Sequence, residues 1–595
     1  MKRIKYNLKG KFLNSKFIQS LMRFWHWKSN VSKLKYLLFV YFLIVLVSSL
    51  LLFSPWTQNV NAERISYIDS VFTTASAFSD TGLVVSDTFK QWNDFGQAII
   101  AILILAGGIG IFALKFFIIN FIFRKKSSSL GEIKLIQSER GGTNTAKITQ
   151  IIISSIKFLF ICIFIFSIAL TIYFYFAAPI HTKGIELLLS NDLRSSDPNH
   201  LKEMQNNFIS PQGNILLALK FGIFHTISAI NNAGFDIMSS FSLMPYYQNY
   251  FLQICFIILL IIGGIGYPAI YDLTCYIKYK IRREKAPYHF SIFTKVSLVT
   301  YALVFLIGFL ISIGFEASSQ NPYALWNQYY IPQNLYSTNG DLYTANQMYS
   351  FHTQYVEWFR NGKNLNDLAK PEYALLNEQK WIFENGQLYG NWFDKTFATL
   401  FTALSTRSAG FATVNIKHFT QGSTFVFIFM MIIGAAPAST GGGIRTTTFA
   451  LIIMGIARVL FGLPRVRMFK RSINQDTVNM SSQVLAIAFI LIVLVSLVLF
   501  SSFKDYGGQI QTMSNSVNAN EIYTTQNIIF EVASAFGTTG LTSGITKSLN
   551  TVSKLALILI MFIGQFGISS TLLVWKRKKN GKRTFEYVDA DVAIG

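Results

Sequence analysis

The sequence has few of the residues that build disulfide frameworks, metal centres or enzyme active sites. Its 3 cysteines all stand inside or at the edge of apolar segments, which excludes a disulfide scaffold and a zinc site. Its 7 histidines show no HExxH spacing, so metal-dependent hydrolysis has no candidate centre. The apolar segments also lack clusters of histidines and carboxylates. We therefore expect a protein that is not an enzyme and that has no covalently bound cofactor.

Charged residues are scarce as well, at 14% of the chain, whereas 51% of the residues are hydrophobic. The mean hydropathy is +0.38. Four long runs contain almost no charge, and each approaches the ~20 apolar residues that cross a lipid bilayer. These runs lie at 37–53, 151–178, 296–315 and 484–500. The sequence therefore predicts a membrane protein with several spans.

The basic residues explain membrane topology better than nucleic-acid binding. The formal net charge is +23, but it is carried by clusters that border hydrophobic segments, and the positive-inside rule places such short basic loops in the cytoplasm. The clusters lie at 1–35, 124–126, 278–285, 465–471 and 576–579. We expect a multi-pass protein of the cell (plasma) membrane with both termini cytoplasmic, in contact with membrane lipid and with no nucleic-acid partner.

Four segments of the sequence share one order of residues. In each, a long apolar run precedes a half-length amphipathic stretch, which leads into a small residue, a glycine and a large apolar residue. The glycines are Gly82, Gly234, Gly410 and Gly540, and a second span with its own glycines follows each of them. Non-helical backbone is tolerated at membrane depth only where it is buried in protein or lines a wet cavity, so the four loops must converge.

We therefore expect an all-α polytopic membrane protein in which four repeats of span, pore helix and span surround one pore with pseudo-fourfold symmetry. The repeats cover 36–126, 145–285, 290–471 and 480–579. Outer insertions lie at 181–211 in the second repeat and at 316–391 in the third, where a gating loop is expected at 434–445. Cytoplasmic tails are expected at 1–35 and 580–595. We interpret the larger insertion as a folded outer cap.

The four loops have the composition of an ion filter. A cation that crosses lipid must exchange water for oxygen ligands, and a ring of backbone carbonyls can supply them. Glycine adopts backbone angles that strain other residues, so its carbonyl can turn toward a common axis. A lone glycine in an apolar segment usually marks close helix packing, and the fourfold recurrence favours the filter. Potassium at this filter is the one metal ion that we expect. The predicted filter residues are Ser79, Asp80, Thr81, Gly82, Asn231, Asn232, Ala233, Gly234, Thr406, Arg407, Ser408, Ala409, Gly410, Gly537, Thr538, Thr539 and Gly540.

The segment 434–445 interrupts the second span of the third repeat with small and polar residues. It lacks the GK[ST] ending of a phosphate-binding loop, so it does not predict a nucleotide site. A flexible segment beneath the filter can block ions until it rearranges, and a static helix break is the alternative interpretation. The gate candidates are Gly434, Ala435, Ala436, Pro437, Ala438, Ser439, Thr440, Gly441, Gly442, Gly443 and Arg445.

Three charged residues stand beside or within these loops, where a charge is costly enough to indicate a function. Asp80 is expected to attract cations at the outer mouth. Arg407 is expected either to bind backbone carbonyls or to pair with an acid such as Asp236 or Glu531. For these two residues and for Arg445, a structural salt bridge is the alternative.

These motifs resemble the Trk/Ktr/HKT superfamily of potassium transport proteins, in particular the membrane (KtrB-like) subunit of bacterial Ktr systems. The resemblance covers nearly the whole hydrophobic chain, because four linked motifs occur in the same order. The matching segments are 80–85, 231–236, 405–411 and 530–541, together with 438–443.

The resemblance implies potassium uptake through a fold related to potassium channels, with one filter glycine per repeat and an intramembrane gating loop in the third. It also implies a homodimer that is regulated by a cytoplasmic ring of separate nucleotide-binding (KtrA-like) subunits. Glycine at all four filter positions is similar to the potassium-selective members of the family. Passive conduction, sodium-assisted conduction and proton-coupled symport all stay open.

One departure from the family pattern concerns the last core helix, which carries Gln565 where an arginine is usual. Gln565 is therefore a further gate candidate, and it puts an arginine-dependent gate in question. Two other functions remain as alternatives to a selective pore. One is a secondary, ion-coupled cation transporter with broken helices, and the other is a less selective conductor of sodium and potassium.

Overall fold

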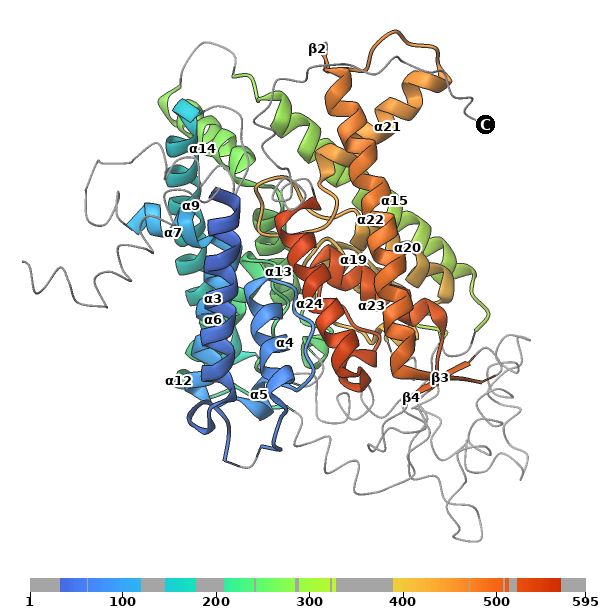
Figure 1. Ribbon diagram of the computed structural model, residues 1–595. Coiled ribbons are helices and arrows are strands. Elements are labelled where there is room, and N and C mark those ends of the chain that lie inside the picture. Colours follow the sequence, from blue (N-terminus) through green and yellow to red (C-terminus); the bar gives the residue numbers. More distant parts are fainter. Residues whose placement is uncertain are drawn as a thin grey trace, which may run out of the picture.

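The computed structural model is a bundle of helices, most of which lie roughly along one common axis (Figure 1). It describes residues 33–60, 62–118, 145–177, 208–239, 242–283, 288–321, 324–327, 389–469, 471–506, 509–512 and 522–568. Nearly all of the basic tail at 1–35, the basic clusters at 124–126 and 576–579 and the tail at 580–595 lie outside the described residues. So does most of the two outer insertions at 181–211 and 316–391.

Four long apolar helices confirm the four apolar runs of the sequence. They are α3 (Lys33–Phe53), α9 (Thr145–Phe176), α15 (Ile292–Ser318) and α22 (Gln475–Leu499), and each is long and apolar enough to cross a membrane. The helices extend beyond the apolar runs because polar residues start them. Asn474, for example, accepts a hydrogen bond from the amide of Asp476 and caps α22, nine residues before the predicted run.

Four short helices lie between the long ones, as the sequence predicts. They are α4 (Tyr67–Phe78), α12 (Ile215–Ile230), α19 (Trp392–Ser405) and α23 (Thr525–Gly537). At about 1.5 Å per residue they are too short to cross a bilayer. Side chains fix where they begin: Ser66 caps α4 and Asn214 caps α12 by accepting hydrogen bonds from the free amides of the first turn. At its other end, each helix leads directly into one of the four glycine motifs.

The second apolar segments are not the continuous spans that we expected. We call the chain segments of the four predicted repeats the first to fourth sections. In the first section α6 (Asp94–Ile109) meets α7 (Ile111–Phe117) at 89°, and in the second section α13 (Tyr250–Gly264) meets α14 (Tyr267–Arg282) at 108°. The bends occur at Gly110 and Gly266, whose φ angles of 90° and 84° are incompatible with an α-helix. In the third section a loop separates α20 (Gln421–Ile432) from α21 (Thr446–Leu460), and the fourth contains α24 (Thr551–Phe566).

Small elements outside the bundle modify the all-α expectation. The described residues contain two short sheets, β1–β2 and β3–β4–β5, both antiparallel. The strands are β1 (Arg467–Met468), β2 (Arg471–Ser472), β3 (Phe503–Tyr506), β4 (Gln509–Thr512) and β5 (Ile522–Tyr523). The connections also contain α5 (Thr88–Gln91) and the 3-10 turns η1 (Pro55–Thr57), η3 (Met244–Tyr246), η6 (Ile416–His418), η7 (Phe500–Ser502) and η8 (Ile545–Ser548).

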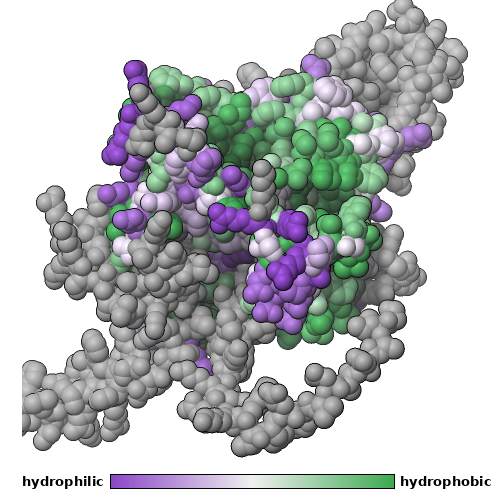
Figure 2. Space-filling model, turned by 90° about the horizontal axis from the view of Figure 1, so that it is seen from above, coloured by the Kyte–Doolittle hydropathy of each residue, from purple (hydrophilic) through white to green (hydrophobic). Residues whose placement is uncertain are grey.

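Different helices and strands lie at the two ends of the bundle. The elements α14, α21 and β2 lie at one end, and α5, β3 and β4 lie at the opposite end (Figure 1). The described parts of two basic clusters, 278–283 and 465–471, therefore share one end, in agreement with their expected placement on one side of a membrane. Seen from above, the surface carries separate hydrophilic and hydrophobic areas (Figure 2).

The short helices connect the four sections into a closed arrangement. Each packs against the long helix before it: α4 on α3, α12 on α9, α19 on α15 and α23 on α22. Each also packs against the second helix of another section: α12 on α6, α19 on α13, α23 on α20 and α4 on α24. The contact between α4 and α24 brings the first and the fourth sections together, and Figure 1 shows blue α4 beside red α24.

We expect the contact between α4 and α24 to depend on an ion pair. Lys554 Nζ lies 2.6 Å from Asp69 Oδ1, and their side chains are only 10% and 14% exposed. Replacing Lys554 with Met should lower the free energy of unfolding by about 2 kcal/mol, because a charge-assisted hydrogen bond in a dry setting is lost. Thermal unfolding in detergent micelles would measure the change.

The matched control is Lys547→Met, which removes the ion pair with Asp87 at 2.8 Å. Lys547 is 52% exposed, so this loss should cost less than about 1 kcal/mol. Equal effects of the two substitutions would show that the ion pair between α4 and α24 does not support the closure.

Candidate functional site

The four glycines of the repeated motif lie together in the structure. A side-chain carbon placed on any one of them would collide with the backbone of the next loop. The collisions run from Gly82 to the carbonyl oxygen of Ala233, from Gly234 to that of Ala409, from Gly410 to that of Thr539, and from Gly540 to that of Thr81. Since the fourth contact returns to the first loop, the glycines form a closed ring, which we call the glycine ring.

The four loops also share an unusual backbone. The φ angles of the ring glycines are 88°, 69°, 78° and 90°, all in the region that favours glycine. Two positions earlier, each loop has a non-glycine residue with positive φ: Asp80, Asn232, Ser408 and Thr538, at 50°, 56°, 65° and 46°. Such residues are uncommon and concentrate at functional sites. Four loops of different sequence therefore adopt one strained conformation.

The short helices aim their C-terminal ends at this ring and hold the loops by backbone hydrogen bonds. The amide just before each of the four glycines donates to a carbonyl in the last turn of the helix. The bonds are Thr81 to Ser76 at 2.9 Å, Ala233 to Ser228 at 2.8 Å, Ala409 to Ser405 at 2.9 Å and Thr539 to Ser534 at 2.8 Å. The C-terminal end of a helix carries a partial negative charge, so all four helix ends favour a cation at the ring.

The predicted filter residues around the glycines are almost entirely buried, and some of them connect neighbouring loops. Ser408 Oγ donates to the carbonyl oxygen of Gly537 at 2.8 Å, and Thr539 Oγ1 donates to that of Thr406 at 3.4 Å. The site thus presents backbone carbonyl and hydroxyl oxygens, which suit alkali cations. Among the described residues, no group of three or more His, Cys, Asp or Glu is placed to hold a metal ion.

The predicted gating segment 434–445 packs against the third and fourth filter loops. Gly442 N donates to Thr538 Oγ1 at 2.8 Å, and Gly441 approaches Ser408 so closely that a side-chain carbon there would lie 2.7 Å from its Cβ. The segment is also tied to the break between α13 and α14: Ala436 N donates to the carbonyl oxygen of Gly264 at 3.0 Å, and Tyr267 N donates to that of Ala438 at 2.9 Å. It therefore bridges three of the four sections.

Arg407 binds backbone carbonyls rather than an acid. Its guanidinium donates to the carbonyl oxygens of Ile433 and Gly434, the latter at 2.8 Å, and lies 4.8 Å from the ring centre of Tyr301. The expected alternatives Asp236 and Glu531 accept hydrogen bonds from other groups. Of the two roles predicted for Arg407, the structure therefore supports the first, and the two carbonyls lie just before the gating segment and at its first residue.

Asp80, which we expected to attract cations at the outer mouth, is enclosed by the protein. Its side chain is fully buried, and Oδ2 accepts a hydrogen bond from Gln565 Nε2 at 3.2 Å. Gln565 Nε2 also donates to the carbonyl oxygen of Thr440 at 2.8 Å, while Arg445 donates to the carbonyl oxygens of Gln565, at 2.6 Å, and Gly441. The residue that replaces the usual arginine thus joins the first filter loop to the gating segment.

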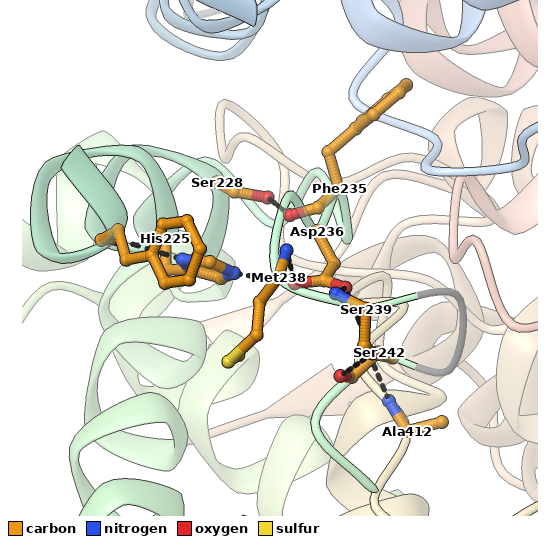
Figure 3. Close-up of polar contacts among 9 residues, drawn as sticks. His225, Ser228, Phe235, Asp236, Met238, Ser239, Ser242 and Ala412 are labelled. Carbon is orange, nitrogen blue, oxygen red and sulfur yellow. Dashed lines mark hydrogen bonds and ion pairs between the residues drawn. The ribbon is translucent and has the colours of Figure 1, made fainter. Parts of the chain in front are cut away.

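Sequence reasoning missed a second set of polar residues, which stands behind the loops. His225 on α12 points to Asp236, and the same carboxylate accepts hydrogen bonds from the amides of Met238 and Ser239 (Figure 3). Glu531 on α23 holds the fourth loop in a related way. Their equal distances in sequence from the motif glycines were the available signal, and we had considered Asp236 and Glu531 only as partners of Arg407.

Comparisons with known proteins agree with the motifs. A family model named TrkH, described as a cation transport protein, matches residues 9–323 and 392–587. The gap between the two matched parts falls within the predicted outer insertion at 316–391. A solved structure of the potassium transporter TrkH from Vibrio parahaemolyticus matches with a TM-score of 0.48 and 14% identity, over 86% of this chain and 79% of that one.

Several relatives match along almost their whole length. An uncharacterized cation transporter, MG322 of Mycoplasma genitalium, is 30% identical over 96% of this chain and 98% of its own. The Ktr system potassium uptake protein D of Bacillus subtilis is 28% identical over 93% and 95%. The potassium/sodium uptake protein NtpJ of Enterococcus hirae is 23% identical over the same shares. The resemblance found in the sequence is thereby confirmed, and the chain belongs to the TrkH family of cation transport proteins.

Proposed function

We propose that this protein takes up potassium across the cell membrane through a filter formed at the glycine ring. The observation that carries the proposal is the closed circuit of contacts among Gly82, Gly234, Gly410 and Gly540. The relatives from Bacillus subtilis and Enterococcus hirae, which are named as potassium and potassium/sodium uptake proteins, support the same ion. The four sections then form a pseudo-fourfold arrangement around one pore.

The chemistry of this filter is that of the backbone. A positive φ at the glycine and again two residues before it turns carbonyl groups away from the helical direction, so that they are free to replace water around an ion. Four helix ends add a negative potential without a fixed charge. Glycine in all four positions leaves the loops close together, in agreement with the potassium-selective pattern of the family.

The gating segment is the proposed gate. It touches the filter residues Ser408 and Thr538, and Arg407 and Arg445 hold its carbonyls. Ions pass only when these contacts rearrange, and the hydrogen bonds to Gly264 and Tyr267 transmit a movement of the α13–α14 bend to the segment. A second copy of the chain, a KtrA-like cytoplasmic ring and an activating sodium ion belong to the same proposal.

A secondary, ion-coupled cation transporter is the second candidate. The bent pairs α6–α7 and α13–α14 favour it, because such transporters place interrupted helices near the membrane midplane. A less selective conductor of sodium and potassium is a variant of the first proposal, favoured by the name of the Enterococcus hirae relative. Flux in reconstituted liposomes separates them: a pore conducts down the potassium gradient alone, whereas a coupled transporter stops when the coupling ion is removed.

We predict that Gly82→Ser lowers the discrimination of potassium over sodium about tenfold, which corresponds to ~1.4 kcal/mol. The glycine has a φ of 88°, and a side-chain carbon would collide with the backbone of the second loop. The permeability ratio in liposomes measures the effect. Gly213→Ser is the matched control, since Gly213 also has a positive φ of 73° but has nothing within 4 Å. If both variants keep the ratio of the unmodified protein, the ring does not act as the filter.

Deleting 438–442 should raise basal potassium flux severalfold, because the segment that lies against the filter is removed. A milder variant is Arg445→Gln, which loses the donors to Gly441 and Gln565. The control is Arg458→Gln on α21, a half-buried arginine that donates a hydrogen bond to Gln475 Oε1 at 2.6 Å. If both gate variants fold normally, at normal yield, and show a flux equal to or lower than that of the unmodified protein, the segment is not a gate. A static helix break would then be favoured.

A further inference from the structure

Two of the four filter loops are braced from behind by a buried acid, and the two braces occupy equivalent positions. His225 stands nine residues before Gly234, and Glu531 stands nine residues before Gly540. Their partners also match, because Asp236 and Thr542 each follow the ring glycine by two residues. The same contact between a pore helix and its loop is therefore built twice, with the acid on the loop in one case and on the helix in the other.

The brace of the second loop is a histidine–carboxylate pair. His225 is fully buried, and its Nδ1 lies 2.8 Å from the carbonyl oxygen of Phe221, which can only accept, so Nδ1 donates. Its Nε2 lies 2.7 Å from Asp236 Oδ1. Asp236 also accepts from the amides of Met238 at 3.0 Å and Ser239 at 2.9 Å (Figure 3). One carboxylate thus fixes the chain that leaves the ring to the helix that enters it.

The second loop is linked onward to the third. Ser239 Oγ donates to the carbonyl oxygen of Ser242 at 2.7 Å, and the amide of Ala412, just after the third filter loop, donates to Ser242 Oγ at 3.1 Å (Figure 3). The amide of Leu243 donates to the carbonyl oxygen of Ala412 at 3.0 Å. The position of Asp236 is therefore transmitted to a neighbouring loop that has no acid of its own.

The brace of the fourth loop surrounds a glutamate with donors. Glu531 is fully buried. Its Oε1 accepts from the hydroxyl of Thr542 at 2.9 Å and from that of Thr546. Its Oε2 accepts from the amide of Ser543 at 3.2 Å and from its hydroxyl at 3.4 Å. As in the second loop, the donors belong to the chain that leaves the ring, and the acid ties them to the pore helix.

The other two loops have no ionisable group at these positions. The first has Thr73 and Val84, and the third has Phe401 and Ala412. In the ring of glycine contacts the second and fourth loops are not neighbours, because the first and third lie between them. The two acids therefore stand behind alternate loops of the ring.

We infer that Asp236 and Glu531, with His225 and Thr542 as their partners, are positioning residues that set the width of the filter and thereby its choice among cations. The inference rests on the proposed function. Each carboxylate accepts several hydrogen bonds, and most of the donors belong to the short stretch directly after the ring glycine. These bonds limit how far the carbonyls of that loop can move away from the ring. Two braces on alternate loops restrict the opening from both sides, and the first and third loops, which lack such a brace, follow.

An exchange of braces tests this inference. His225→Glu alone sets two carboxylates against each other, and Asp236→Thr alone leaves His225 without its acid. Together, the two substitutions transplant the Glu531–Thr542 pair into the second loop. The readout is the ratio of potassium to sodium and rubidium permeability of the full chain in liposomes. We expect each single variant to lower the potassium-to-sodium ratio about tenfold and the double variant to recover most of it.

Two further variants keep the test valid if a single substitution in α12 prevents folding. Glu531→Gln and Thr542→Val are close in volume to the original residues, and both should lower the ratio severalfold. The control is Lys220→Gln on the same helix as His225. Lys220 makes an ion pair at 2.5 Å with Asp94, whose side chain is 88% exposed, so the ratio should not change.

The outcomes separate the inference from the proposed function. If the unmodified protein is selective, and Glu531→Gln, His225→Glu and Asp236→Thr all conduct with its ratio, the braces do not position the filter. A lowered ratio that the double variant fails to recover would also overturn the inference, because the contact would then not be the cause. If the unmodified protein shows no selective potassium flux, or Gly82→Ser keeps its ratio, the filter proposal itself fails.

Discussion

Backbone polar groups at membrane depth need partners, and this constraint organises the whole centre of the molecule. Four chain segments leave their helices at buried positions, where water is not available to bond their amides and carbonyls. The amide before each glycine returns to its own helix, and the loops lie against one another in a closed circuit. In the proposed filter the carbonyls of the ring replace part of the water around a cation, which is the partner that such oxygens fit.

The same constraint explains the contacts of Arg407, which is buried, and of Arg445, which is half-buried. The segment 434–445 is another stretch of irregular backbone, and its carbonyls are bound by Arg407 and Arg445. Arg407 belongs to the third filter loop, and Arg445 is the last residue of the segment itself. Hydrogen bonds therefore connect the third filter loop to the segment. Gln565 adds a link to Asp80 in the first loop. A rearrangement of the segment therefore changes the surroundings of several filter loops at once.

Sequence reasoning predicted what depends on composition and on recurrence. Long apolar runs predicted α3, α9, α15 and α22, and the repeated glycine motif identified residues that the fold brings together. It failed where the outcome depends on side-chain direction. Asp80 was expected to attract cations at the outer mouth, but its buried carboxylate accepts a hydrogen bond from Gln565. The bends at Gly110 and Gly266 were also missed, because an apolar segment with glycines has the same composition whether the helix continues or turns.

The braces behind the second and fourth loops show a further limit. His225 and Glu531 are unlike residues, so a comparison of single positions does not pair them. Only the register of the repeats and the contacts to Asp236 and Thr542 reveal the shared arrangement. Rubidium or thallium scattering from the purified protein would test the central claim most directly. The account predicts cation density on the axis of the glycine ring, among the carbonyls of the four loops. Cation density confined to the bends of α6–α7 or α13–α14, with none at the ring, would contradict it.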